Sequence, residues 1–122
     1  MSLHLASIGF DCDDAAALAA FWSAVLDRPV DPDASPDFAS IGVTAPDAGS
    51  PGWLFQKVPE PKTAKNRCHV DLHVDDRPAV QVEVDRLAGL GATVIREPKE
   101  EYGAYWATLQ DPEGNELCIG AA

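Results

Sequence analysis

The chain has 122 residues, of which 46% are hydrophobic, so it can bury a core as one soluble domain without disulfides or a structural metal. A net charge of −11 with no dense basic cluster argues against binding a nucleic acid or an anionic membrane surface. Cysteines at 12, 68 and 118 without metal-site spacing, and the lack of a long apolar run or signal peptide, predict a cytoplasmic protein.

The first half of the chain predicts a strand, a helix and two more strands. Residues 3–11 form the first strand, and Asp13 or Asp14 caps the helix. Residues 27–29 end this helix, and residues 30–37 are a loop with a short edge strand. Strands are expected at 38–44 and 53–58. The buried face of the helix is predicted from apolar residues at helical spacing, which are Leu18, Phe21, Trp22, Val25 and Leu26.

The second half repeats this pattern after a polar connector at residues 59–66. Residues 68–75 alternate between polar and apolar, which predicts a half-buried strand. Asp76 caps a helix that ends near Gly89 and Gly91, and its apolar stripe is Val80, Val84, Leu87 and Ala88. Strands at 92–97, 105–110 and 116–120 follow, with a turn at 111–114 between the last two.

The two halves are related by a constant offset. The predicted caps, Asp14 and Asp76, lie 62 positions apart, as do Ser7 and His69, and Gln56 and Cys118. Such self-similarity predicts two tandem βαβββ modules, at about residues 1–60 and 66–122, in a single α+β domain. We expect the two modules to form a curled mixed sheet, a half-barrel with helices outside and a cleft inside that suits a small molecule.

Three motifs together resemble a known family. They are Cys12-Asp13-Asp14 followed by Phe21-Trp22 and Leu26, then residues 69–76, and then residues 111–117. Their order and spacing resemble the glyoxalase / bleomycin resistance / dioxygenase (vicinal oxygen chelate) superfamily, and the Phe-Trp pair resembles its glyoxalase-like domain group. The resemblance implies a homodimer and a small-molecule ligand.

The resemblance also implies where a divalent metal would bind. Metal-dependent members place ligands in the first and last strands of each module, which correspond here to Ser7, Gln56, His69 and Cys118. Only His69 is a good ligand of the expected kind, and the carboxylate usual at the last position is replaced by a thiol. We therefore expect no metal and no other cofactor. A divalent metal held by an atypical ligand set is the alternative.

Alternation along the strands predicts the lining of the cleft. His69, Asp71 and His73 share one strand face, while Trp106 and Thr108 lie opposite Leu109, which should face the helix. With Ser7, Gln56 and Cys118, these residues form the predicted ligand-binding cleft. Trp106 either stacks on a ligand or fills the cleft as core.

Four functions are open from the sequence. The first is metal-free binding of a small organic molecule, as in bleomycin resistance. The second is a lyase, isomerase or dioxygenase with an atypical metal site. The third is a metal-free acid-base enzyme that uses His69 or Asp71, and the fourth is a protein-interaction module.

Overall fold

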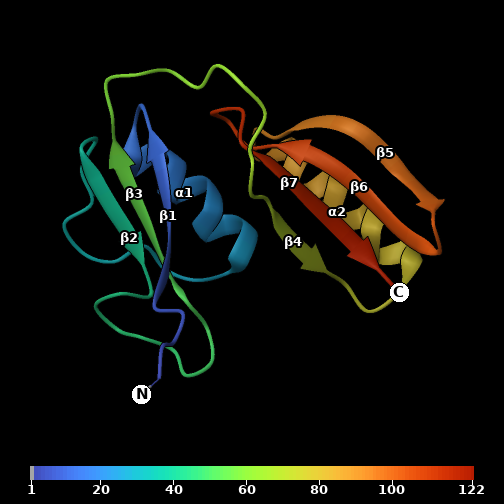
Figure 1. Ribbon diagram of the computed structural model, residues 1–122, viewed down its shortest axis with the longest axis horizontal. Helices are drawn as coiled ribbons and strands as arrows, with labels where there is room; N and C mark the ends of the chain where they lie inside the picture. The colour runs from blue at the N-terminus through green and yellow to red at the C-terminus, as the bar shows by residue number, and fades with distance from the viewer. Residues whose placement is uncertain (1) are drawn as a thin grey trace. The chain divides into compact units, whose positions relative to one another are not determined.

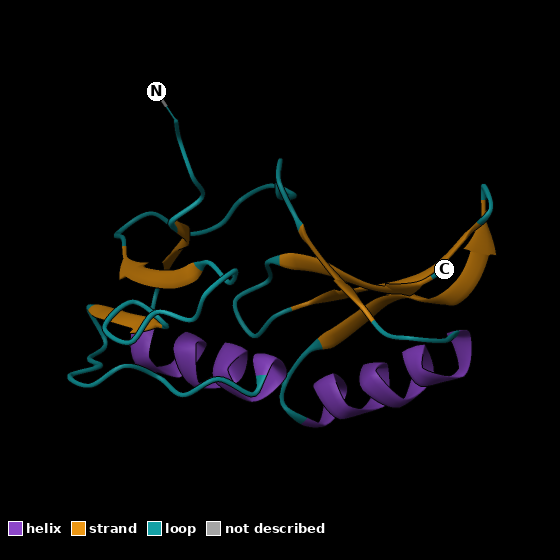
Figure 2. Ribbon diagram, turned by 90° about the horizontal axis from the view of Figure 1, so that it is seen from below, coloured by secondary structure: helices purple, strands orange, loops and turns teal. Residues whose placement is uncertain are grey.

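The computed structural model describes residues 2–122, which form two compact units divided between Pro61 and Lys62. The division falls inside the polar connector. Each unit is a mixed β-sheet with one helix packed along one face (Figures 1 and 2). The predicted α+β class with two repeated modules is thus confirmed. No helix among these residues has the length and apolar character that crossing a membrane requires.

The first module, up to Pro61, contains one helix and a sheet of three strands. Its elements are β1 (Ser7–Cys12), α1 (Ala15–Leu26), β2 (Phe38–Ile41) and β3 (Gly52–Lys57). The strand order is β1-β3-β2, with β1 parallel and β2 antiparallel to β3. Val30 bridges Ile41 beyond β2, which matches the short edge strand predicted there.

Helix α1 begins and ends as its sequence predicts. The side chain of Asp14 accepts a hydrogen bond from the backbone N–H of Ala17 at 3.1 Å, which satisfies one of the free donors of the first turn. The helix ends at Asp27, which adopts the left-handed conformation with φ 52°. Trp22 is buried on the helix face and stacks on Trp53 of β3, with ring centres 5.0 Å apart. Four of the five predicted core residues of the helix are buried, and Leu26 is half-buried.

The second module, Lys62–Ala122, repeats this connectivity with one more full strand. Its elements are β4 (Val70–His73), α2 (Arg77–Gly89), β5 (Thr93–Glu101), β6 (Ala104–Gln110) and β7 (Glu116–Ala121). The order is β4-β7-β6-β5, with β4 parallel to β7 (Figure 1). Asp76 caps α2 by accepting the N–H of Ala79 at 3.0 Å.

Several predicted boundaries were wrong, and the pairing pattern explains why. The first strand starts at Ser7 instead of residue 3, because strand pairing with β3 begins only there. The strand predicted at 68–75 is limited to Val70–His73, since β7 pairs with these four residues alone. The strand predicted to end at 97 continues to Glu101, because β6 pairs with it up to the hairpin turn. Ala88, predicted as core, is exposed on α2.

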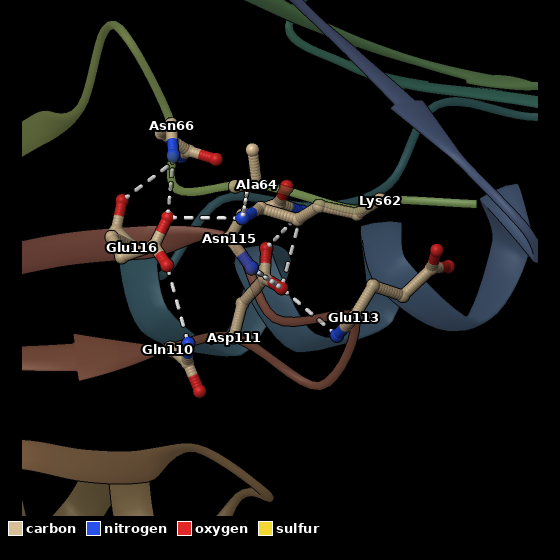
Figure 3. Close-up of polar contacts among 8 residues, drawn as sticks. All are labelled: Lys62, Ala64, Asn66, Gln110, Asp111, Glu113, Asn115 and Glu116. Carbon is tan, nitrogen blue, oxygen red and sulfur yellow. Dashed lines mark hydrogen bonds and ion pairs between the residues drawn. The ribbon is translucent and has the colours of Figure 1, made fainter. Parts of the chain in front are cut away.

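The turn predicted at 111–114 is confirmed, and it is built around one buried carboxylate. Asp111 is 2% exposed, and its Oδ1 accepts the backbone N–H groups of Glu113 and Asn115 at 2.9 and 3.0 Å (Figure 3). The N–H of Gly114 donates to the carbonyl of Asp111 at 2.9 Å. This network fixes how β7 returns beside β6.

Candidate functional site

The face of the second module's sheet that points away from α2 carries rows of polar side chains. Helix α2 lies along one face of this sheet (Figure 2). Leu109, Leu117 and Ile119 are buried on that side, so the residues that alternate with them point to the other face. Among residues 62–122 no helix covers that second face. The strand register therefore decides which polar side chains lie next to one another.

The central row runs across all four strands. Asp71 of β4 pairs with Cys118 of β7, Cys118 pairs with Thr108 of β6, and Thr108 pairs with Arg96 of β5. His69 precedes Asp71 by two residues, and its Nε2 lies 3.1 Å from the Asp71 carboxylate. The row thus has a carboxylate with an imidazole at one end, a guanidinium at the other, and a thiol and a hydroxyl between them.

Cys118 is a neutral thiol in this row. Burial raises its pKa, a hydrogen bond with Thr108 at 3.5 Å partly offsets this, and the charge of Asp71 raises it again. Because the thiolate is the reactive form, a raised pKa suppresses nucleophilic chemistry at neutral pH. Cys118 in this state is suited to packing or weak hydrogen bonding with a ligand rather than to attack on it.

The neighbouring row contains His73, Gly120, Trp106 and Lys99. Gly120 lies between His73 and Trp106. A Cβ placed on it would lie 3.5 Å from His73 Nε2 and 3.4 Å from the Cβ of Trp106. Glycine at this position therefore leaves room between the imidazole and the indole. His73 is exposed, and within the described residues no hydrogen bond or ion pair joins it to the His69–Asp71 pair.

Arg96 is a site residue that the sequence did not reveal. Its guanidinium carbon lies 3.8 Å from the centre of the Trp106 ring, and its Nη2 lies 3.1 Å from Glu101. It also donates a hydrogen bond to the Trp106 carbonyl, so the side chain is 18% exposed and held in place. Irregular pairing between Val94 and Arg96 turns Arg96 onto this face. Trp106 is thus a half-buried wall with a cation on its ring.

Glu116 ties the connector to this sheet at the start of β7, where it pairs with Gln110 of β6. Its carboxylate accepts the backbone N–H of Asn66 at 2.8 Å and the Gln110 amide at 3.2 Å, and it lies 3.2 Å from Lys62 Nζ (Figure 3). Burial alone would raise the pKa of Glu116, but these hydrogen bonds outweigh burial and lower the pKa to about 2. Glu116 is therefore charged at neutral pH and has a structural role.

The first module does not assemble its share of the predicted metal ligands. Ser7 pairs with Gly52, whereas Gln56 pairs with Asp11 at the other end of the same two strands. Four residues of strand separate them along the sheet, which is about 13 Å. Gln56 instead lies beside Phe38 in a surface hollow of about 630 Å³, lined by Asp37, Phe38, Gln56, Lys57, Val58 and Pro59.

The strand register also changes which residues of the two modules correspond to each other. Asp71 lies five residues before the cap of α2, as Gly9 does before the cap of α1. Asp71 pairs with Cys118, but Gly9 pairs with Leu54. The counterpart of Cys118 is therefore Leu54, which has no metal-binding atom, and the offset of 62 does not hold for the last strands. The usual four-ligand site of the superfamily does not fit these residues.

The repeated unit, a helix on a mixed sheet whose first strand runs parallel to its last, defines the glyoxalase-like α+β class. A family model described as "Glyoxalase-like domain" matches residues 7–120. The chain belongs to this family.

Solved structures agree with this assignment. A glyoxalase/bleomycin resistance protein/dioxygenase family enzyme from Burkholderia phytofirmans PsJN is 25% identical, with 98% of each chain covered and a TM-score of 0.80. A glyoxalase-related enzyme from Fulvimarina pelagi is 16% identical over 98% of this chain and 88% of its own, with a TM-score of 0.76. A lactoylglutathione lyase from Agrobacterium tumefaciens is 19% identical over 98% and 93%, with a TM-score of 0.67. No curated protein matches the sequence.

Proposed function

We propose that this protein binds a small organic molecule on the polar face of the second module's sheet, without the four-ligand metal site of its metal-dependent relatives. The row from Asp71 through Cys118 and Thr108 to Arg96, with Trp106 beside it, is the observation that carries this proposal. It places a few convergent polar groups and one aromatic wall on a single face, the composition typical of small-molecule sites.

The chemistry of the row favours binding over covalent catalysis. The neutral Cys118 thiol is a poor nucleophile. The Asp71 end offers a charged acceptor that is 61% exposed, which suits an ammonium or another hydrogen-bond donor of the ligand. Arg96 and Glu101 neutralise each other at 3.1 Å, so the other end offers the indole and the Thr108 hydroxyl rather than a net charge.

A melting-temperature screen with small aromatic amines, in EDTA, tests this function. A ligand present at 100 times its Kd stabilises the native state by about 2.7 kcal/mol. We expect Trp106→Ala and Thr108→Val to abolish the shift for any hit. Tyr102→Ala is the matched control, because Tyr102 lies at the tip of the same hairpin and is 95% exposed. Binding that survives in both Trp106→Ala and Thr108→Val would contradict the proposal, and so would binding that needs a metal.

A second candidate is metal-free acid-base catalysis by His69. The contact of 3.1 Å with Asp71 favours it, because a carboxylate that holds an imidazole is a common arrangement for proton transfer. Turnover of a bound ligand that His69→Ala abolishes, with binding retained and turnover in wild type dependent on pH, would support this role. Turnover that His69→Ala leaves unchanged would exclude it.

We also propose that the protein is cytoplasmic, as its cysteine usage suggests, and that it forms a homodimer, as the resemblance to its superfamily implies. The mass of one chain is 13.0 kDa. Sedimentation equilibrium at micromolar concentration should give about twice this mass. A single species of monomer mass would contradict the dimer.

A further inference from the structure

The second module brings three different metal-binding side chains together without help from the first. One ligand atom from each of His69, Asp71 and Cys118 lies within 4.8 Å of the other two. The backbone sets part of this proximity, because Asp71 and Cys118 are register partners on parallel strands. His69 lies just before β4, and its Nε2 is 3.1 Å from the Asp71 carboxylate. This set shares His69 and Cys118 with the superfamily's ligand positions, but replaces the ligands of the first module with Asp71.

We propose that His69, Asp71 and Cys118 form a three-ligand site for a thiophilic divalent cation, Zn²⁺ first, contained within the second module. This goes beyond the proposed binding function, which needs no ion. Zinc accepts nitrogen, sulfur and oxygen ligands together, and sites with three protein ligands keep a fourth position open. A soft sulfur ligand disfavours Mg²⁺, Ca²⁺ and Mn²⁺ relative to Zn²⁺.

The geometry requires only a small adjustment. Ligand atoms around a tetrahedral zinc lie about 3.5 Å apart, given bonds of about 2.0–2.3 Å. The His69–Asp71 atoms are already 3.1 Å apart, and their side chains are 49% and 61% exposed, so rotation about side-chain bonds can open that contact and bring Cys118 within range. On binding, Cys118 releases its thiol proton to water and coordinates as the thiolate, while His69 coordinates as the neutral imidazole, with no change of oxidation state.

Thr108 supplies a supporting contact for the thiolate. Its Oγ1 lies 3.5 Å from the Cys118 sulfur, so its hydroxyl can donate a hydrogen bond once the thiol proton has left. Hydrogen bonds of this kind from residues around the ligands stabilise bound metals and fix the orientation of the ligands. Trp106 and Arg96 lie outside the three-ligand set, which leaves that part of the face to an organic ligand.

Titration of the full-length reduced protein with Co²⁺ tests the site, because cobalt reports its ligands by absorption. We expect one equivalent to bind, with a thiolate-to-cobalt band in the near ultraviolet and the visible bands of a tetrahedral ion, and Zn²⁺ should displace it. Cys118→Ser should abolish the thiolate band. His69→Ala and Asp71→Asn should each weaken binding on the order of 100-fold or more, since loss of even a supporting residue costs about 10- to 100-fold.

Two matched variants in the same module serve as controls. Cys68 is a free, exposed thiol outside the cluster, and His73 is an exposed imidazole on the same strand face as Asp71. Cys68→Ser and His73→Ala should keep both the affinity and the thiolate band, and circular dichroism should show every variant folded. A band that survives in Cys118→Ser would overturn the proposal, and so would a band lost in Cys68→Ser. The absence of binding at about 100 μM Co²⁺ would overturn it as well, because it would mean a Kd well above that concentration.

The two proposals fail separately. Binding of an organic ligand is measured in EDTA and is judged by Trp106→Ala, a residue outside the three-ligand set. Cobalt binding is measured without organic ligand and is judged by His69→Ala and by the thiolate band of Cys118. A cobalt site that is absent leaves the organic-ligand result unchanged, and the reverse also holds.

Discussion

Replacing Glu116 by glutamine should destabilise the protein at neutral pH and much less in acid. The pKa of this carboxyl is lowered from 4.5 to about 2 in the folded protein, and its side chain is 10% exposed. Since one pKa unit corresponds to about 1.4 kcal/mol, the charged form contributes about 3 kcal/mol to folding at pH 7. Glutamine removes the charge and presents an N–H donor where Lys62, Asn66 and Gln110 already donate.

The direction of the pH dependence follows from the lowered pKa. The stabilisation is complete above the unfolded pKa of about 4.5 and is lost as the pH falls towards 2. At pH 3 less than half of it remains. The difference in stability between wild type and Glu116→Gln should therefore shrink by about 2 kcal/mol between pH 7 and pH 3.

Urea denaturation at pH 7 and pH 3, followed by tryptophan fluorescence, measures this difference. Glu97→Gln is the control, because Glu97 is an exposed acid on the same sheet and its replacement should change stability by less than about 0.5 kcal/mol. A Glu116→Gln protein as stable as Glu97→Gln at pH 7 would refute the reasoning. A stability difference that is equal at the two pH values would refute it as well.

Two backbone positions give further predictions, both read from thermal denaturation. Asp27→Gly should stabilise the protein by about 0.5–1 kcal/mol, because Asp27 has φ 52° at the end of α1. Relief of the left-handed strain, roughly 1–2 kcal/mol, exceeds the entropic cost of glycine, roughly 0.5–1 kcal/mol; a loss of stability would contradict this. Gly42→Ala should cost about 2 kcal/mol, because φ is 68° and a Cβ would lie 2.0 Å from Arg28 Nη2, displacing the guanidinium that donates to the Pro51 carbonyl at 2.9 Å. Gly49→Ala, with φ 80° and nothing within 4 Å, should cost only about half as much, and equal losses would exclude the clash.

Local signals predicted the elements of this fold well because each is fixed by neighbours in sequence. The caps at Asp14 and Asp76 and the turn at Asp111 depend on side chains that bond to backbone groups two to four residues away. The apolar stripe of α1 has the helical period, and its main members are buried. Strand ends were less predictable, because the partner strand determines where pairing stops, as for β4 and β5.

The site was harder to predict, because it depends on register across strands. Alternation correctly put Thr108 and Trp106 on the face opposite Leu109. It could not place Arg96, since the irregular pairing that turns this residue towards Trp106 has no sequence pattern of its own. Counting along the chain also made Gln56 the counterpart of Cys118, and only pairing with β1 shows that Leu54 takes that place.

The register accounts for why both proposed sites lie in the second module. A ligand set shared by two modules needs a donor at the first-module position, and there Gly9 and Leu54 are the counterparts of Asp71 and Cys118. Neither glycine nor leucine has a side-chain atom that could bind a metal or exchange a proton. The polar side chains of the candidate site lie instead on the strands of the second module, β4 to β7. Backbone pairing within that one sheet sets their spacing. Any ion or organic ligand should therefore depend on second-module variants and be insensitive to Ser7→Ala and Gln56→Ala, a pattern opposite to that of a site shared between modules.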